Sequence, residues 1–340
     1  MEAKIQSIIL LIELAAGIAF GRVMIPAVRR IKTGKFDIYI GDRFKQDGSE
    51  PRFGGGVIFL TLLMGLAVGG AAAGLGMKEH FALLCVVIYL TVLLDMGIIE
   101  DRQRDTKQGI GIKPVKRFLV KLISSMILVW LLDFLGFGCA EILLPFRLGY
   151  IELGELSVPV NALLITGLIT AVEIHDCHKG LHETGIDGLC TLSVMIASLG
   201  LAAGFSVNGG RETAQLVCLC TAGSCGAFLM WSISPSKIYL GQSGGLVLGG
   251  AVCSAMVLSG LQPAAVFALA AVIIDAVCAV LQRAVFVKTK KLLLKGASLH
   301  EHLRAVSWGD YKIMGLFGII QLMGSAAAIA FMIYENKLVI

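Results

Sequence analysis

The sequence predicts an all-α integral membrane protein, a single polytopic bundle of about ten transmembrane helices that takes up residues 1–340. Hydrophobic residues make up 56% of the chain and charged residues only 16%, and the mean hydropathy is +0.83. This composition is far from that of a soluble domain. Apolar runs recur along the whole length, so no hydrophilic half indicates a second domain.

Windows of about 20 apolar residues, the length that crosses a bilayer core, define the predicted spans. They lie at residues 5–25, 54–76, 81–99, 118–137, 158–174, 188–205, 214–233, 246–261, 263–286 and 311–334. Only Gln262-Pro263 marks the break between the eighth and ninth spans. Residues 1–28 lack a short apolar region followed by a small-residue cleavage site, so we expect a retained first span rather than a signal peptide.

Small residues inside the spans are interpreted as packing residues. Glycines such as Gly65, Gly69 and Gly70 suit the close approach of helices in lipid. The nine cysteines lie mostly in apolar runs and form no CxxC pair, so we expect small packing side chains rather than disulfide partners.

Lysine and arginine residues are concentrated on alternate loops, and this asymmetry predicts the orientation. The first, third and ninth loops are strongly basic, whereas the loops between them carry few basic residues. Odd-numbered loops are therefore expected in the cytoplasm and both termini outside. The net charge of +5 is thus a topology signal that also suits anionic lipid, and it does not indicate nucleic-acid binding.

Polar constellations gather at the predicted cytoplasmic face. They are Glu100-Asp101, residues 175–187, residues 239–245 and His300-Glu301-His302. Such groups are costly beside hydrocarbon unless they line a site or a water-filled mouth. Acids, histidines, glycines and lysines at one boundary suit a soluble anionic substrate that meets a lipid substrate. Phosphates there would need a divalent ion held by carboxylates.

At these residues the chain resembles the phospho-N-acetylmuramoyl-pentapeptide transferase family, within glycosyltransferase family 4 and the wider polyprenyl-phosphate N-acetylhexosamine-1-phosphate transferase superfamily. Six motifs follow the family's order over nearly the whole chain. They are residues 25–34 (IPAVRRIKTG), 46–55 (QDG, then PRFGG), 97–101 (GIIED), 185–189 (GIDGL), 234–244 (SPSKIYLGQSG) and 298–302 (SLHEH). Each motif alone is a weak indication, whereas six in order on a ten-span frame are a strong one.

The resemblance implies a reaction and its setting. Phospho-N-acetylmuramoyl-pentapeptide, or a related N-acetylhexosamine phosphate, would pass from a UDP-sugar to polyprenyl phosphate such as undecaprenyl phosphate, and UMP would leave. This would be peptidoglycan precursor synthesis in the bacterial plasma membrane, with a homodimer as the expected assembly. Phosphoryl transfer depends mainly on positioning and charge neutralisation, here through Mg²⁺.

The resemblance also implies roles for individual residues. The implied catalytic residues are Glu100, Asp101, His300 and His302; the substrate-binding residues are Asp187, Tyr239, Arg104 and Lys113; the metal ligands are Asp101, Gln242 and Glu301. Glu100 stands where a carboxylate activates the lipid phosphate. Asp187 faces the nucleotide, and Tyr239 takes the place of an aromatic ring that stacks on uracil.

Several positions depart from the family pattern. Gln242 replaces the metal-binding aspartate, and an amide oxygen is a much weaker partner for Mg²⁺ than a carboxylate. Leu181 and Thr184 stand where the family has an asparagine and an aspartate, and Glu301 replaces the middle histidine. Because one acid is lost and another gained, we expect Glu301 to supply the carboxylate that position 242 lacks.

Three functions therefore remain open. The first is an active Mg²⁺-dependent transferase. The second is a catalytically degenerate relative, a pseudoenzyme that binds lipid, nucleotide sugar or a partner without turnover. The third is a transporter or channel, which is disfavoured because the middle of the spans is nearly free of charge, with Asp275 as the main exception.

Local alternatives remain open as well. Glu100-Asp101 could end a helix at the headgroups, Asp187 could cap the sixth helix, and Tyr239 could be an interfacial aromatic residue. A transition-metal site is a further alternative for four residues in the fifth loop, namely His175, Cys177, His178 and His182. A solvated loop is the commoner explanation for them, because nearby glycines weaken a helix there.

Overall fold

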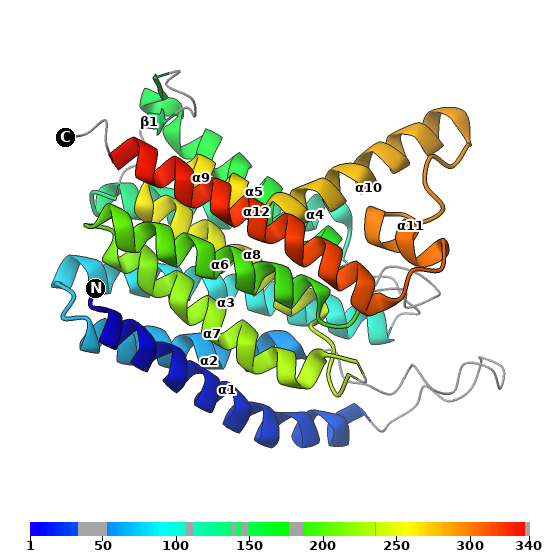
Figure 1. Cartoon of the computed structure of the whole chain (residues 1–340), viewed down its shortest axis with the longest axis horizontal. Coiled ribbons are helices and arrows are strands. Elements are labelled where there is room, and N and C mark those ends of the chain that lie inside the picture. The colour runs from blue at the N-terminus through cyan, green and yellow to red at the C-terminus, as the bar shows by residue number, and fades with distance from the viewer. Residues whose placement is uncertain are drawn as a thin grey trace.

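The computed structural model describes residues 1–32, 53–106, 112–137, 141–143, 149–176, 186–234 and 236–336, and in these ranges the chain is built almost wholly of helices (Figure 1). They are α1 (Ala3–Lys32), α2 (Gly54–Ala72), α3 (Met77–Thr106), α4 (Pro114–Phe134), α5 (Ser157–His175), α6 (Leu189–Asn208), α7 (Glu212–Ser232), α8 (Gly241–Ser259), α9 (Gln262–Ala268), α10 (Ala270–Thr289), α11 (Leu299–Ala305) and α12 (Asp310–Asn336). A short antiparallel pair, β1 (Glu141–Leu143) and β2 (Tyr150–Glu152), lies between α4 and α5. The predicted all-α class is confirmed.

Nine of the described helices are long and apolar enough to cross a membrane, which supports the predicted polytopic bundle. They are α1, α2, α3, α5, α6, α7, α8, α10 and α12. The remaining predicted span, residues 118–137, coincides largely with α4. This helix is not among the nine because it carries more charged residues, namely Lys116, Arg117, Lys121 and Asp133. The start of α1 and the end of α12 lie at the same end of the bundle, as expected for an even number of crossings with α4 included (Figure 1).

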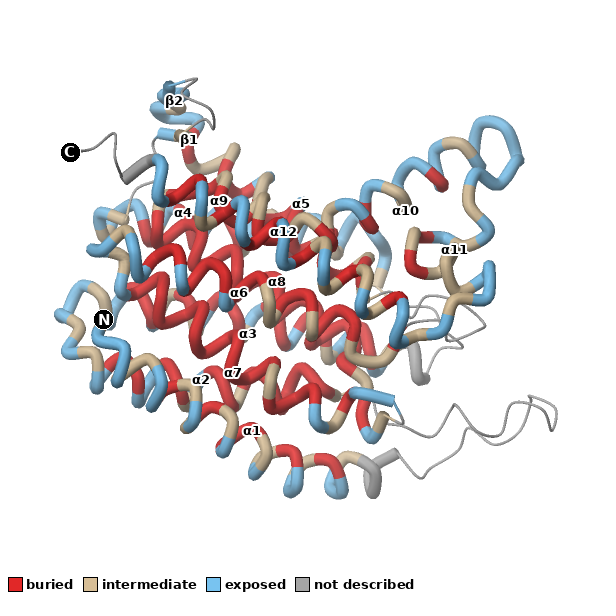
Figure 2. Tube along the Cα trace, viewed as in Figure 1, coloured by how far each residue is buried: buried red, intermediate tan, exposed pale blue. Residues whose placement is uncertain are grey.

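Helix α8 forms the centre of the bundle, and every residue of it is buried (Figure 2). Its N-terminal end fits between α2 and α3 because both helices present a glycine there. A Cβ atom on Gly97 would lie 2.2 Å from the Cα atom of Ser243, and one on Gly55 would lie 2.5 Å from the Gly244 nitrogen. These glycines belong to three different sequence motifs, so the motifs meet at this end of α8.

Gly97→Ala is therefore expected to destabilise the protein by about 1–3 kcal/mol, the usual cost of overpacking a tight contact. The matched control is Gly167→Ala in α5, where an added Cβ would meet open space and where alanine suits a helix better than glycine. Thermal unfolding of the detergent-solubilised protein measures both. A Gly97→Ala protein as stable as the Gly167→Ala protein would contradict the close α3–α8 contact.

The predicted ninth span, residues 263–286, is interrupted in the structure, where α9 ends at Ala268 and α10 begins at Ala270. The side chain of Gln321 in α12 binds the backbone on both sides of this break. Its Oε1 accepts the Ala271 N–H at 3.1 Å, and its Nε2 donates to the Ala268 carbonyl. An irregular backbone inside a membrane protein needs such partners because lipid offers none. The predicted span therefore contains two helices, of which α10 is long and apolar enough to cross a membrane.

The first span contains a buried acid, Glu13, which qualifies the sequence-based view that Asp275 is the main charge within the spans. Glycines of the neighbouring helices make room for it. A Cβ atom on Gly65 would lie 1.4 Å from Glu13 Oε1, and one on Gly223 would lie 2.5 Å from Glu13 Cβ. The packing role predicted for Gly65 is thus confirmed.

Candidate functional site

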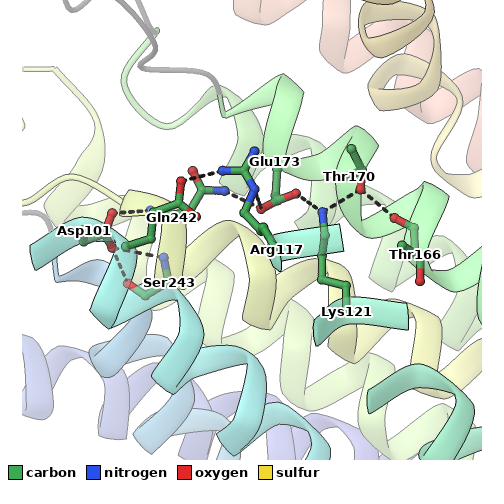
Figure 3. A network of polar contacts seen from close by, with 9 residues as sticks. Asp101, Arg117, Lys121, Thr166, Thr170, Glu173, Gln242 and Ser243 are labelled. Atoms are coloured by element: carbon green, nitrogen blue, oxygen red, sulfur yellow. Dashed lines mark hydrogen bonds and ion pairs between the residues drawn. The ribbon is translucent and has the colours of Figure 1, made fainter. Parts of the chain in front are cut away.

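Asp101, near the end of α3, holds the N-terminus of α8 (Figure 3). Its Oδ1 accepts the Gln242 N–H at 2.9 Å, and its Oδ2 accepts the Ser243 N–H at 3.1 Å and the Ser243 hydroxyl at 3.0 Å. The first N–H groups of a helix have no partner within the helix, and a negative charge there is favourable. Both carboxylate oxygens of Asp101 are therefore engaged with α8.

The buried Glu100 and the partly exposed Arg117 form an ion pair between α3 and α4. Arg117 Nη1 donates to Glu100 Oε1 at 2.5 Å, and Arg117 Nε lies 4.0 Å from Glu173 Oε1 on α5. The Glu100 side chain is 1% exposed and that of Arg117 is 15% exposed. Arg117 is therefore the partner of the predicted catalytic carboxylate, and it reaches toward a second acid.

Glu173 is the centre of the same constellation. Its Oε2 accepts from Lys121 Nζ at 2.5 Å, and its Oε1 accepts from the side-chain amide of Gln242 at 2.5 Å. Lys121 also donates to Thr170 Oγ1 at 2.7 Å. We call Glu100, Arg117, Lys121, Glu173 and Gln242 the charge network (Figure 3). It links α3, α4, α5 and α8.

A small pocket lies beside the start of α8, and two of the predicted substrate-binding residues line it. They are Asp187 and Tyr239, joined by Asp176 from the end of α5. The backbone of Tyr239 is tied to α2, because its carbonyl accepts the Gly54 N–H at 3.0 Å. The N-cap residue of α6 is Gly188, with φ +81°, and Asp187 precedes it. The structure thus places both predicted nucleotide contacts on one pocket.

A second buried cluster joins α5, α10 and α11, and we call it the histidine–aspartate cluster. Asp275 Oδ2 lies 2.9 Å from His175 Nδ1 and 2.7 Å from His300 Nδ1, and Asp275 Oδ1 accepts the His300 N–H at 3.1 Å. A carboxylate only accepts, so each Nδ1 atom carries the proton. His175 Nε2 lies 3.0 Å from Ser193 Oγ. Among the described groups, His300 Nε2 is buried and has no hydrogen-bond partner.

The C-terminal end of α5 contributes one residue to each of three features: the charge network, the histidine–aspartate cluster and the pocket. Glu173 belongs to the charge network, His175 to the histidine–aspartate cluster, and Asp176 to the pocket. His175 is thus a buried helix residue rather than part of a solvated loop. The other members of the alternative transition-metal site, Cys177, His178 and His182, lie outside the described residues.

The remaining predicted site residues occupy separate positions. Glu301 Oε2 accepts the Ala297 N–H at 2.6 Å, and His302 Nδ1 accepts the Lys295 N–H at 3.1 Å, so both side chains stabilise the loop before α11. Lys113 directly precedes α4 and is exposed, and the side chain of Arg104 lies outside the described residues. The pairing of Glu301 with Gln242 stays a prediction.

The donors predicted to bind Mg²⁺ do not fit that ion as they are placed. Both oxygens of Asp101 accept hydrogen bonds from α8, Gln242 directs its amide N–H groups toward Glu173, and Glu301 binds its own loop. Mg²⁺ needs oxygen ligands at about 2.0–2.1 Å in near-octahedral geometry.

The histidine–aspartate cluster has three ligand atoms within 4.8 Å of one another, a spacing that a metal ion could use. Its Nδ1–Oδ2 distances of 2.9 and 2.7 Å are those of direct hydrogen bonds, which a bound ion would have to replace.

Sequence reasoning missed Arg117, Lys121 and Glu173. Lys121 lies inside the predicted span 118–137 and Glu173 inside 158–174, and an ionisable residue within a span indicates a functional site by default. The sequence therefore contained a reason to examine Lys121 and Glu173. It did not show that these two residues form an ion pair, because 52 residues separate them.

Comparisons with known proteins all indicate similarity to one group of transferases. The model of a family described as glycosyl transferase family 4 matches residues 83–260. The chain is 28% identical to the phospho-N-acetylmuramoyl-pentapeptide-transferase of Clostridium perfringens (strain SM101 / Type A), over 95% of this chain and 95% of that protein. It is 25% identical to the protein of the same name from Desulfitobacterium hafniense (strain DSM 10664 / DCB-2), over 92% of this chain and 93% of that protein.

Proposed function

The chain belongs to glycosyl transferase family 4, and from this premise we propose that it transfers a sugar-1-phosphate from a UDP-sugar to polyprenyl phosphate. The sugar phosphate is phospho-N-acetylmuramoyl-pentapeptide or a related N-acetylhexosamine phosphate, and the reaction serves cell-wall precursor synthesis in the bacterial plasma membrane. The observation that carries the proposal is the meeting of the family motifs around the N-terminus of α8, beside the pocket lined by Asp187 and Tyr239.

The proposed reaction is a displacement at phosphorus. An oxygen of the lipid phosphate bonds to the β-phosphorus of the UDP-sugar, the bond from that phosphorus to the bridging oxygen breaks, and UMP leaves with the electron pair. Asp187 and Tyr239 hold the nucleotide. Glu100 faces the lipid phosphate, and Arg117 beside it offsets negative charge. Such chemistry depends mainly on positioning and on electrostatic stabilisation.

UMP release tests the proposal. The purified protein is incubated with undecaprenyl phosphate and either UDP-N-acetylmuramoyl-pentapeptide or UDP-N-acetylglucosamine, and UMP is expected only when donor and lipid are both present. Glu100→Gln should slow release by about 10²–10⁴-fold, the range for losing a general base, whereas Asp310→Asn, at a partly exposed position, should leave it unchanged. No UMP with any donor rejects the proposal.

A second candidate is a degenerate family member that binds its substrates without turnover. The specific observation that favours it is Gln242, whose amide is bound to Glu173 where the resemblance places a metal-binding aspartate. Thermal stabilisation by a UDP-sugar, without UMP release in the presence of undecaprenyl phosphate, would support this candidate.

A further inference from the structure

We propose that this chain binds its phosphate substrates without a divalent cation, because the lysine and arginine of the charge network take over the charge role of the ion. The identity of the phosphates rests on the proposed function. The arrangement of charges stands independently of it.

The first step is the charge balance of the network. Glu100 is paired with Arg117 and Glu173 with Lys121, and Gln242 carries no charge. These four charges, three of them buried and Arg117 partly exposed, therefore cancel in two pairs without any ion. A Mg²⁺ site is normally formed by one or two carboxylates together with substrate phosphates. Here each of these two acids already has a fixed cation at 2.5 Å.

The second step concerns Gln242 and Lys121. Gln242 places its amide Nε2 2.5 Å from Glu173 Oε1, so the hydrogen-bond donor of the amide faces the acid. Lys121 Nζ lies 2.5 Å from the other oxygen of the same carboxylate. A divalent cation that bound Glu173 would lie next to this ammonium, and like charges in a buried site repel strongly. Lys121 therefore closes the position to a metal ion.

The third step concerns which cation of the charge network a substrate phosphate can reach. The Lys121 side chain is 3% exposed, and Arg117 at 15% is the more open of the two. A guanidinium has five N–H donors in a planar fork and suits phosphate oxygens. Arg117 can therefore present N–H groups to an incoming phosphate while it remains beside Glu100. In this arrangement Lys121 balances Glu173, and Arg117 meets the substrate.

Mn²⁺ binding to the full-length protein in detergent tests the proposal without any need for turnover. Electron paramagnetic resonance of free Mn²⁺ is expected to show no site tighter than about 1 mM in the wild type, a standard free energy near −4 kcal/mol. K121Q/Q242D removes the ammonium and adds a carboxylate beside Glu173, so it should gain one Mn²⁺ site. Two matched controls accompany it. K121Q/Q242N removes the ammonium but adds no carboxylate, and Q242D alone adds the carboxylate but keeps the Lys121–Glu173 pair. Neither control should gain a Mn²⁺ site.

Two results would overturn the proposal. One is a wild-type Mn²⁺ site tighter than about 1 mM, and the other is the failure of K121Q/Q242D to gain a site. A second arm compares UMP release in excess EDTA and in Mg²⁺: rates within about twofold support the proposal, and stimulation by Mg²⁺ of about tenfold or more contradicts it. If no UMP appears under either condition, the proposed function fails while the Mn²⁺ titration still decides this inference.

Discussion

Asp275→Ala is expected to lower the free energy of unfolding by about 3–5 kcal/mol, the cost of removing one partner from a buried charged arrangement. Asp275 is fully buried and accepts from His175, from the His300 side chain and from the His300 backbone. Alanine would leave His175 Nδ1 and the His300 N–H buried without this acceptor, while His300 Nδ1 would keep only Ser298 Oγ at 2.9 Å. Each buried donor without an acceptor costs about 1–3 kcal/mol. SDS-induced unfolding of the purified protein measures the loss.

The matched control for this prediction is Asp310→Ala. Asp310 also pairs with a basic side chain, Arg304, at 3.2 Å, but the two side chains are 35% and 38% exposed. An exposed pair contributes only about 0–1 kcal/mol. If Asp275→Ala cost no more than Asp310→Ala, the histidine–aspartate cluster would not stabilise the fold as described.

A second substitution of Asp275, to asparagine, separates a positioning role from a purely structural one. The resemblance implies that His300 is a catalytic residue, and Asp275 holds both its ring and its backbone. Asp275→Asn keeps the size of the side chain but puts an N–H group where one acceptor was. We expect it to keep most of the stability and to reduce UMP release, because the His300 ring turns. Equal UMP release by a folded Asp275→Asn protein would limit Asp275 to a structural role.

The fold class and the family followed from the sequence because they depend on long, repeated signals. Apolar windows mark the spans without any knowledge of tertiary contacts, and the six ordered motifs indicated the family that the comparisons now confirm. The break after Ala268 could not be predicted in this way. It depends on Gln321, about 50 residues away, whose side chain binds the backbone on both sides.

The site was predicted only in part, for a related physical reason. The motifs pointed to Asp101 and Gln242, which contact each other at the start of α8, to Glu100 beside Asp101, and to Asp187 and Tyr239, which line one pocket. Their interactions depend on residues that belong to none of the six motifs. Arg117, Lys121 and Glu173 show themselves in the sequence only as charges in or next to apolar spans, and their partners lie on other helices. His175 was grouped with a loop because the helix boundary could not be seen.

The second large effect is expected from the Lys121–Glu173 pair. Lys121→Met and Glu173→Met should each destabilise the protein by about 3–5 kcal/mol, because each leaves a buried charge without its partner. The double variant K121M/E173M should recover most of that loss, since apolar side chains of similar size replace both charges. The resulting coupling energy, measured by SDS-induced unfolding, is expected to exceed about 2 kcal/mol.

The partly exposed Arg304–Asp310 pair again provides the control, with an expected coupling below about 1 kcal/mol. A coupling that small for Lys121 and Glu173 would mean that the two charges do not depend on each other. The double variant also separates stability from function. Because it is expected to fold without either charge, its UMP release reports the chemical role of the pair alone. A folded double variant that turns over at the wild-type rate would show that the ion pair serves only the fold, whereas a folded and inactive one would mean that the buried charges act on the phosphates.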